Sequence, residues 1–82
     1  MFTVYALSSE VRNYIYVGMT SNLEKRLTAH NRGYERTTRP YKPFRLIYIE
    51  EYSTREAARK REKQLKTGVG KSFLKSLSQK IE

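Results

Sequence analysis

FTVYALSSEVRNYIYVG, residues 2–18, is the stretch from which the fold is most readily predicted. Residues 2–7 and 14–17 are rich in strand-forming side chains, and the polar segment 8–13 between them is typical of a hairpin connection. We therefore expect two antiparallel strands, with Gly18 ending the second. Alternation along that strand places Tyr14, Tyr16 and Gly18 on one face and Ile15 and Val17 on the other.

A helix is predicted directly after this hairpin. Ser21, followed three residues later by Glu24, fits a capping box in which the serine side chain caps the helix. The helix is expected to span residues 22–31. Leu23 and Leu27 begin an apolar stripe along it, and the stripe stops near His30.

The second half of the chain predicts one strand and two helices. Residues 44–52 have the clearest strand pattern in the sequence. A second capping box, Ser53 with Glu56, opens a helix that runs to about Lys66, and Gly68 is expected to stop it. A last short helix is expected over residues 71–79, with the buried side formed by Phe73, Leu74 and Leu77.

The predicted order of elements is strand, strand, helix, strand, helix, helix. This order indicates an α/β (α+β) fold, in which helices flank a small three-stranded antiparallel sheet. A chain of 82 residues bounds the protein to one domain with one modest core, and neither a repeat nor a linker interrupts it. We therefore expect a single domain over residues 1–82.

The composition narrows the class of partner. Lys and Arg number 17 against eight acidic residues, all glutamate, so the formal net charge is +9. This surplus favours polyanions such as nucleic acid, because each cation placed near a phosphate releases counterions. The chain has no cysteine and a single histidine, which excludes disulfides and Cys-based metal sites. No apolar run approaches the length of a membrane span, so no membrane association and a cytoplasmic location are expected.

A loop over residues 32–43 combines cations with Tyr34 and Tyr41. Basic and aromatic side chains in one segment suit contact with phosphates and bases, although a solvated surface loop explains the same composition. The predicted nucleic-acid contacts are Arg32, Arg36, Arg39 and Lys42 in this loop, and Lys63 and Lys66 on the later helix.

Glu62 is the clearest anomaly in the helical pattern. Ala58, Glu62 and Leu65 fall on one stripe at spacings of four and three residues, so a carboxylate lies where the helix should face the sheet. Such a group is costly unless it is paired or binds a metal. One interpretation is a magnesium ligand. The other is an ion pair with Lys66, four residues on, and helical geometry alone favours the pair.

Four further side chains are candidates for chemistry on a phosphate. Arg26 and His30, four residues apart, share one side of the first helix, where Arg26 can clamp a phosphate and His30 can assist proton transfer. Tyr5 and Tyr16 can lie side by side on adjacent strands. A tyrosine has an ordinary pKa of about 10, so it acts as a base only where a cation lowers that value. Taken singly, each of these residues is also an ordinary surface or strand residue.

One motif is rejected. Residues 68–72, GVGKS, resemble the end of a phosphate-binding P-loop. The full motif requires a glycine five residues before Gly70, and that position is Leu65. The segment also follows a helix rather than a strand, so we interpret it as a break between two helices.

Jointly, these residues resemble the GIY-YIG nuclease family, and the resemblance covers nearly the whole chain. Thr3-Val4-Tyr5 corresponds to the first motif and Tyr16-Val17-Gly18 to the second. Residues 19–23 resemble the family's turn into its first helix. The family's functional positions are matched by Arg26, His30 and Glu62. The chain departs from the family at Thr3, Val4 and Val17, and it has no counterpart of a C-terminal asparagine found in some members.

The resemblance implies a metal-dependent endonuclease that hydrolyses phosphodiester bonds in DNA. Glu62 would hold a single divalent cation, Mg²⁺ or Mn²⁺, together with water and the scissile phosphate. Arg26 would stabilise charge on that phosphate, and His30 would assist. Tyr5 or Tyr16 would deprotonate or orient the attacking water, and the sequence leaves open which of them does so.

Alternatives from other classes remain. The chain can be a non-catalytic nucleic-acid-binding module, which needs the charge but not Glu62. It can also be a small structural partner of a larger ribonucleoprotein, or a nuclease that acts only with a partner protein or as a homodimer. DNA is favoured over RNA, and the preferred form of the substrate stays open.

Overall fold

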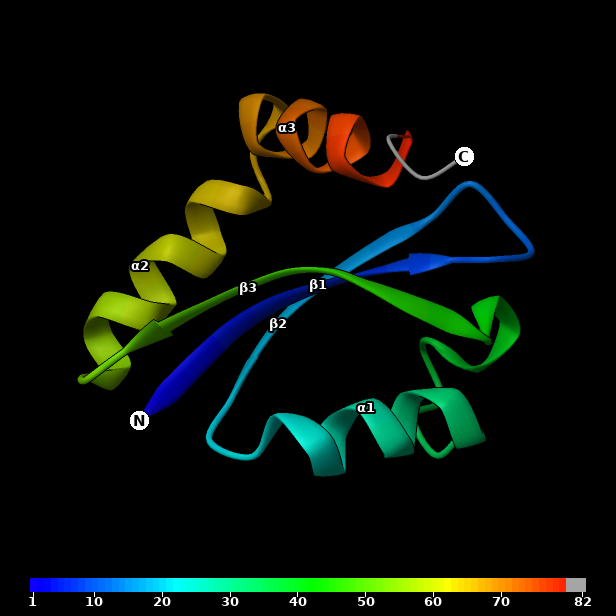
Figure 1. Cartoon of the computed structure of the whole chain (residues 1–82), viewed down its shortest axis with the longest axis horizontal. Coiled ribbons are helices and arrows are strands. Elements are labelled where there is room, and N and C mark those ends of the chain that lie inside the picture. Colours follow the sequence, from blue (N-terminus) through cyan, green and yellow to red (C-terminus); the bar gives the residue numbers. More distant parts are fainter. Residues whose placement is uncertain (80–82) are drawn as a thin grey trace.

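The computed structural model describes residues 1–79 of the chain, and residues 80–82 of the predicted domain lie outside the described part. The predicted fold class and element order are confirmed (Figure 1). The elements are β1 (Phe2–Ser9), β2 (Ile15–Thr20), α1 (Leu23–Arg32), the short 3-10 helix η1 (Arg39–Tyr41), β3 (Phe44–Tyr52), α2 (Arg55–Leu65) and α3 (Gly68–Gln79).

The sheet is antiparallel with strand order β2-β1-β3, so β1 is central and β2 is an edge strand. Helices α2 and α3 cover one face, and α1 covers the other (Figure 1). The register places Tyr5 of β1 opposite Gly18 of β2 and Ile49 of β3. The tyrosine of the first motif and the glycine of the second are therefore direct neighbours.

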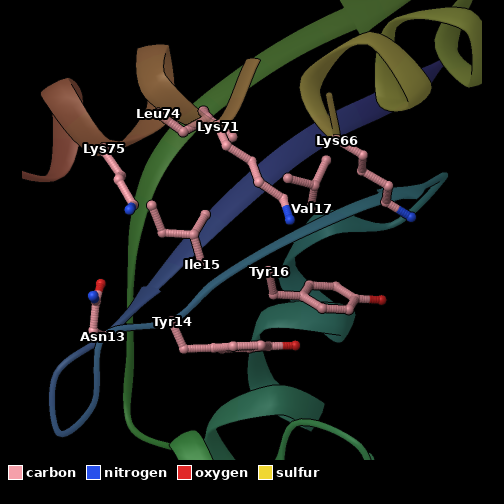
Figure 2. Close-up of a pocket in the computed structure, with 9 residues that line it drawn as sticks. All are labelled: Asn13, Tyr14, Ile15, Tyr16, Val17, Lys66, Lys71, Leu74 and Lys75. Atoms are coloured by element: carbon pink, nitrogen blue, oxygen red, sulfur yellow. The ribbon is translucent and has the colours of Figure 1, made fainter. Parts of the chain in front are cut away.

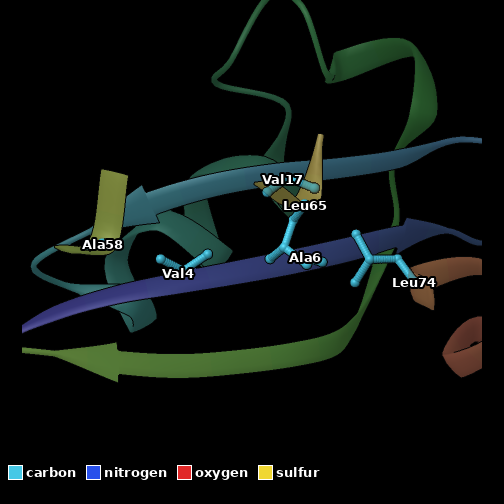
Figure 3. Close-up of a cluster of buried hydrophobic side chains, with 6 residues drawn as sticks. All are labelled: Val4, Ala6, Val17, Ala58, Leu65 and Leu74. Atoms are coloured by element: carbon cyan, nitrogen blue, oxygen red, sulfur yellow. The ribbon is translucent and has the colours of Figure 1, made fainter. Parts of the chain in front are cut away.

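Two apolar clusters separate on the two faces of the sheet because β1 alternates. Val4 and Ala6 point towards α2 and α3, in a cluster with Val17, Ala58, Leu65 and Leu74 (Figure 3). Tyr5 and Leu7 point the other way, in a cluster with Phe44 that Tyr14, Tyr16, Leu23 and Leu27 join. The predicted division of β2, with tyrosines on one face and Ile15 and Val17 on the other, is confirmed.

Both predicted capping serines are wrong by one residue. Asn22, not Ser21, caps α1, and its side chain accepts a hydrogen bond from the backbone N–H three residues on. Thr54, not Ser53, caps α2 in the same way. In each case the residue after the serine also carries a capping oxygen, so local sequence alone did not distinguish the two candidates.

The second strand and the loop also differ from prediction. Gly18 lies within β2, which continues to Thr20 because β1 extends far enough to pair with it. The segment 32–43 contains the helix η1, and Tyr41 within it stacks on Tyr14 with ring centroids 3.9 Å apart. One aromatic ring expected to contact bases is therefore used in packing.

The last helix begins at Gly68, three residues earlier than predicted, so Gly68 starts a helix rather than only ending one. The reason is Thr67, whose hydroxyl donates to the Gln64 carbonyl and accepts from the N–H of Gly70. At Gly70 a Cβ would lie 2.5 Å from the Cα of Leu65, so this glycine allows α2 and α3 to meet closely. The P-loop-like glycine thus serves helix packing.

The predicted buried side of the last helix is partly wrong. Leu74 is fully buried and Leu77 packs against the same cluster, as expected. Phe73 is exposed, and its ring meets Tyr48 of β3 edge-on with centroids 5.7 Å apart. Phe73 therefore packs on the surface of β3 instead of entering the core.

Candidate active site

A buried chain of hydrogen bonds links the sheet to α1. The hydroxyl of Tyr5 lies 3.1 Å from Nε2 of His30, and Nδ1 of His30 lies 3.0 Å from the hydroxyl of Thr38. All three residues are fully buried. Every group is satisfied when Tyr5 donates to Nε2 and Nδ1–H donates to Thr38, whose own proton goes to the Glu35 carbonyl. This arrangement fixes one tautomer of a neutral His30.

Burial determines the protonation of the two partners. The pKa of His30 is lowered, first by burial and then by the positive charge of Arg26. The pKa of Tyr5 is raised by burial, and the nearby Arg26 guanidinium opposes this only in part. Near neutral pH the pair is therefore an uncharged imidazole and an intact phenol.

Gly18 lies beneath the tips of both tyrosines. The rings of Tyr5 and Tyr16 have centroids 6.2 Å apart, and Tyr16 also packs on His30 at 4.7 Å. A Cβ on Gly18 would lie 2.7 Å from the Tyr5 hydroxyl oxygen and 2.8 Å from a ring carbon of Tyr16. The second motif therefore needs glycine because any side chain would push the two rings apart.

Arg26 lies beside this cluster and forms an ion pair with Glu35 at 3.0 Å between Nη1 and Oε2. Each side chain is about one third exposed, so solvent reaches both. The Nε of Arg26 is buried and has no hydrogen-bond partner within residues 1–79. Sequence reasoning missed Glu35; the available signal was a single acid in an otherwise basic loop.

Glu62 lies on α2, on the other face of the sheet from α1. Its side chain is only 12% exposed, which confirms the unusual position of this carboxylate. Its described ion-pair partners are Arg59 of α2 at 3.9 Å and Lys66, the residue that caps the end of α2, at 3.1 Å. The structure thus brings Tyr5, Tyr16, Arg26 and His30 together, and it places Glu62 apart from their hydrogen-bond network.

One cavity is lined both by Tyr16 and by the ion-pair partner of Glu62. A space of about 530 Å³ follows β2, and both Tyr16 and Lys66 line it (Figure 2). Lys66 is one helical turn after Glu62, so the carboxylate lies close to the wall of a cavity that Tyr16 lines from the other side. Tyr5, in contrast, is fully buried and does not line it.

The residues present fit a cation that takes most of its ligands from outside the protein. No group of three or more histidine, cysteine or acidic side chains that could hold a metal exists among the described residues. Mg²⁺ commonly keeps several waters and binds through one or two carboxylates plus substrate phosphate oxygens. Glu62 can supply one such carboxylate if Lys66 and Arg59 release it.

The six predicted nucleic-acid contacts all lie on the surface. Arg32, Arg36, Arg39, Lys42, Lys63 and Lys66 are exposed. Arg39 is partly committed to structure, because its Nε donates to the carbonyl of Gly33 at 2.8 Å. Gly33 ends α1 with a left-handed backbone, φ 78°, so this contact fixes where the basic loop leaves the helix.

Comparison with known proteins places this fold and site in a class. The family model described as the GIY-YIG catalytic domain matches residues 1–75. The chain therefore belongs to the GIY-YIG family, a nuclease family whose members generally use divalent metal ions and act on nucleic acid.

Its curated relatives are small proteins. The chain is 33% identical over 69 residues to the UPF0213 protein SH2523 of Staphylococcus haemolyticus, which covers 83% of this chain and 84% of the relative. It is 37% identical over 67 residues to the UPF0213 protein CPE1444 of Clostridium perfringens, covering 80% and 72%. No solved structure matches the chain. No helix within residues 1–79 is long and apolar enough to cross a membrane.

Proposed function

We propose that this chain is a metal-dependent endonuclease that hydrolyses phosphodiester bonds in DNA, working as one domain over residues 1–82. The observation that carries the proposal is the position of Tyr16. Its ring packs on His30 within the tyrosine cluster, and it also lines the open cavity beside β2. Of the two motif tyrosines, Tyr5 and Tyr16, it is therefore the one that lines a space open to substrate.

Tyr16 is our candidate for accepting or orienting the proton of the attacking water. Tyr5 is fully buried and its pKa is raised by burial, so it is poorly suited to meet water or to lose a proton. We assign Tyr5 to positioning: it donates to His30, and His30 in turn packs under the Tyr16 ring. His30 keeps Tyr5 and Tyr16 in place rather than carrying charge.

Arg26 is our candidate phosphate clamp. Its guanidinium keeps its charge at any working pH and offers donors in a planar fork that matches two phosphate oxygens. In the free protein Glu35 occupies one of these donors. Because the ion pair is partly exposed, replacing the Glu35 carboxylate by a phosphate should cost little free energy. Until substrate binds, Glu35 holds the Arg26 side chain in position.

Glu62 is our candidate metal ligand. The chemistry supplied by a bound Mg²⁺ or Mn²⁺ is neutralisation of charge on the scissile phosphate and its leaving oxygen. Lys66 and Arg59 are paired with Glu62 in the free protein. If Glu62 bound the metal ion instead, both side chains would be free to contact phosphates.

The test is cleavage of labelled duplex, single-stranded, flapped and branched DNA and of RNA, each with Mg²⁺, Mn²⁺ or EDTA. We expect cutting by the wild-type chain that requires metal and that Glu62→Gln abolishes without weakening binding. Glu56→Gln, an equal charge change on the same helix, is the matched control and should cut normally. Metal-independent cutting, or full activity of Glu62→Gln, would overturn the proposal.

A non-catalytic nucleic-acid-binding module is the second candidate. The observation that favours it is the engagement of Glu62 by Arg59 of its own helix and by Lys66 at the end of that helix. In that case Glu62→Gln changes stability but no activity, and wild type binds without cutting any substrate in the panel. A nuclease that needs a partner protein or a second copy gives the same result alone and gains activity when the partner is added.

A further inference from the structure

Two cavities join along the outer edge of β2. The first, of about 530 Å³, extends from Lys66 to Lys75, and the second, of about 290 Å³, continues around the hairpin. They share four lining residues: Asn13, Tyr14, Ile15 and Lys75. We call the joined space the β2 groove. Figure 2 shows its main part, with Lys71 and Lys75 of α3 and Lys66 at the end of α2 on one side, and Tyr14 and Tyr16 on the other.

The charged side chains that line the β2 groove in the described part of the chain are all cations. Five cations line it: Arg12, Arg45, Lys66, Lys71 and Lys75. No carboxylate lines it among residues 1–79, which contain seven of the eight glutamates of the chain. Of the five, only Lys66 forms an ion pair within the described part of the chain. The other four form no ion pair with any residue in 1–79, so a polyanion in the groove would gain from counterion release.

The geometry of α3 aims two of these cations at the groove. Lys71 and Lys75 are four residues apart, so they lie on one side of the helix, and Leu74 between them anchors that side in the core. The far end is fixed as well, because Arg45 donates from Nη2 to the carbonyl of Ser78 at 3.0 Å. The cations thus come from the β1–β2 connection, β3, the end of α2 and α3.

The β2 groove also reaches a residue of the candidate active site. Tyr16 lines the groove and packs on His30, so an anion chain lying in the groove passes the catalytic tyrosine. Positive grooves with aromatic side chains are the usual means of binding a single nucleic-acid strand. The groove is bounded by Lys66, Lys71 and Lys75 on one side and by Tyr14 and Tyr16 on the other, so cations and aromatic rings lie along the same path.

We propose that the β2 groove is the path of the sugar–phosphate backbone of a single nucleic-acid strand, with Lys71 and Lys75 contacting phosphates next to the scissile one. This inference rests on the proposed function, because it takes Tyr16 as the point of attack. It makes single-stranded segments, including flaps, the preferred substrate. It also assigns Lys71 and Lys75, which sequence reasoning did not select.

The test is binding of a short fluorescent oligothymidylate by anisotropy, in EDTA and over a range of salt concentrations. We expect Lys71→Ala with Lys75→Ala to weaken binding roughly tenfold at low salt and to reduce the slope of log affinity against log salt by about 1.4, two contacts at about 0.7 each. Lys25→Ala with Lys60→Ala, an equal loss of charge on exposed positions of α1 and α2, is the matched control and should keep the wild-type slope. Lys71→Arg with Lys75→Arg should bind as wild type.

Three results would overturn the inference. Equal weakening by both alanine pairs would mean that net charge, not the groove, binds the strand. Duplex DNA bound as tightly as the single strand, with the same dependence on Lys71 and Lys75, would exclude a path for one strand. Polyglutamate competing as well as oligothymidylate would make the groove a general anion site.

Failure of the proposed function gives a different pattern. If wild type cuts nothing with any metal but binding still depends on Lys71 and Lys75, the endonuclease proposal fails and the groove assignment stands. If cutting is normal in the Lys71→Ala, Lys75→Ala variant, the groove assignment fails and the endonuclease proposal stands.

Discussion

The hydroxyl of Tyr5 and Nε2 of His30 lie 3.1 Å apart in a space that no solvent reaches. This hydrogen bond joins the central strand to α1, the helix that covers that face of the sheet. It also holds the imidazole under the ring of Tyr16 at 4.7 Å between centroids. One buried contact therefore links α1 to the sheet and holds His30 against Tyr16, which lines the candidate substrate cavity.

The buried imidazole predicts a pH dependence of stability. Because the pKa of His30 is lowered on folding, the unfolded chain takes up a proton below the ordinary value of 6.5 while the folded chain does not. The free energy of unfolding should therefore fall as pH drops from about 7 to 5, with a slope of no more than about 1.4 kcal/mol per pH unit for one proton. Urea unfolding across this range measures it.

His30→Gln is the control for this effect. His30 is the only histidine in the chain, and glutamates titrate at lower pH, so the variant should have nearly constant stability over the same range. An unchanged slope in His30→Gln would show that the pH dependence comes from other groups.

The two tyrosines should respond differently to loss of their hydroxyls. Tyr5→Phe leaves Nε2 of His30 buried without a donor, and we expect a loss of about 1–3 kcal/mol in the free energy of unfolding. Tyr16→Phe should leave stability nearly unchanged and reduce the cleavage rate by about 10²-fold or more, since it removes the hydroxyl that we assign to the attacking water. Denaturation and single-turnover cleavage separate the two effects. The reverse pattern would transfer the catalytic role to Tyr5.

Gly18→Ala should be destabilising although alanine favours strands no less than glycine. The added Cβ would lie 2.7 Å from the Tyr5 hydroxyl oxygen, and relief of such overpacking typically costs about 1–3 kcal/mol. Gly68→Ala is the matched control, because a Cβ there meets nothing within 4 Å. That variant should keep or slightly increase stability, and thermal unfolding of both variants checks the prediction. Equal stability of the two variants would contradict the role given to Gly18.

Glu35→Gln tests whether the ion pair restrains the clamp. The pair is about one third exposed, so its loss should change stability by less than about 1 kcal/mol. Affinity for nucleic acid at low salt should rise several-fold, because Arg26 is released and a negative charge beside the phosphate is removed. Glu24→Gln, an equal charge change at the start of α1, is the control. A drop in affinity would indicate instead that Glu35 holds Arg26 in its productive position.

Features that follow from strand alternation or from helical spacing could be predicted from the sequence. Alternation in β2 determined that Tyr16 and Gly18 share a face, and the helical spacing placed Arg26 and His30 together. The same reasoning identified Glu62 on the buried stripe of α2 and its pair with Lys66. Helix starts were less predictable, because Ser21 and Asn22 offer equivalent caps and the choice depends on how the chain leaves β2.

The contacts that complete the site come from residues distant in sequence, and no local pattern encodes them. Thr38 and Glu35 meet α1 only because the basic loop folds back through η1, and Lys71 and Lys75 line the groove only because α3 packs against the sheet. Sequence periodicity specifies which face a side chain occupies, so it identified the strands, the helices and the family's positions. Which faces then meet depends on packing of the whole chain, since burial of apolar surface is not directional. Because of that packing, Tyr5 is fully buried, whereas Tyr16 lines a groove rich in cations.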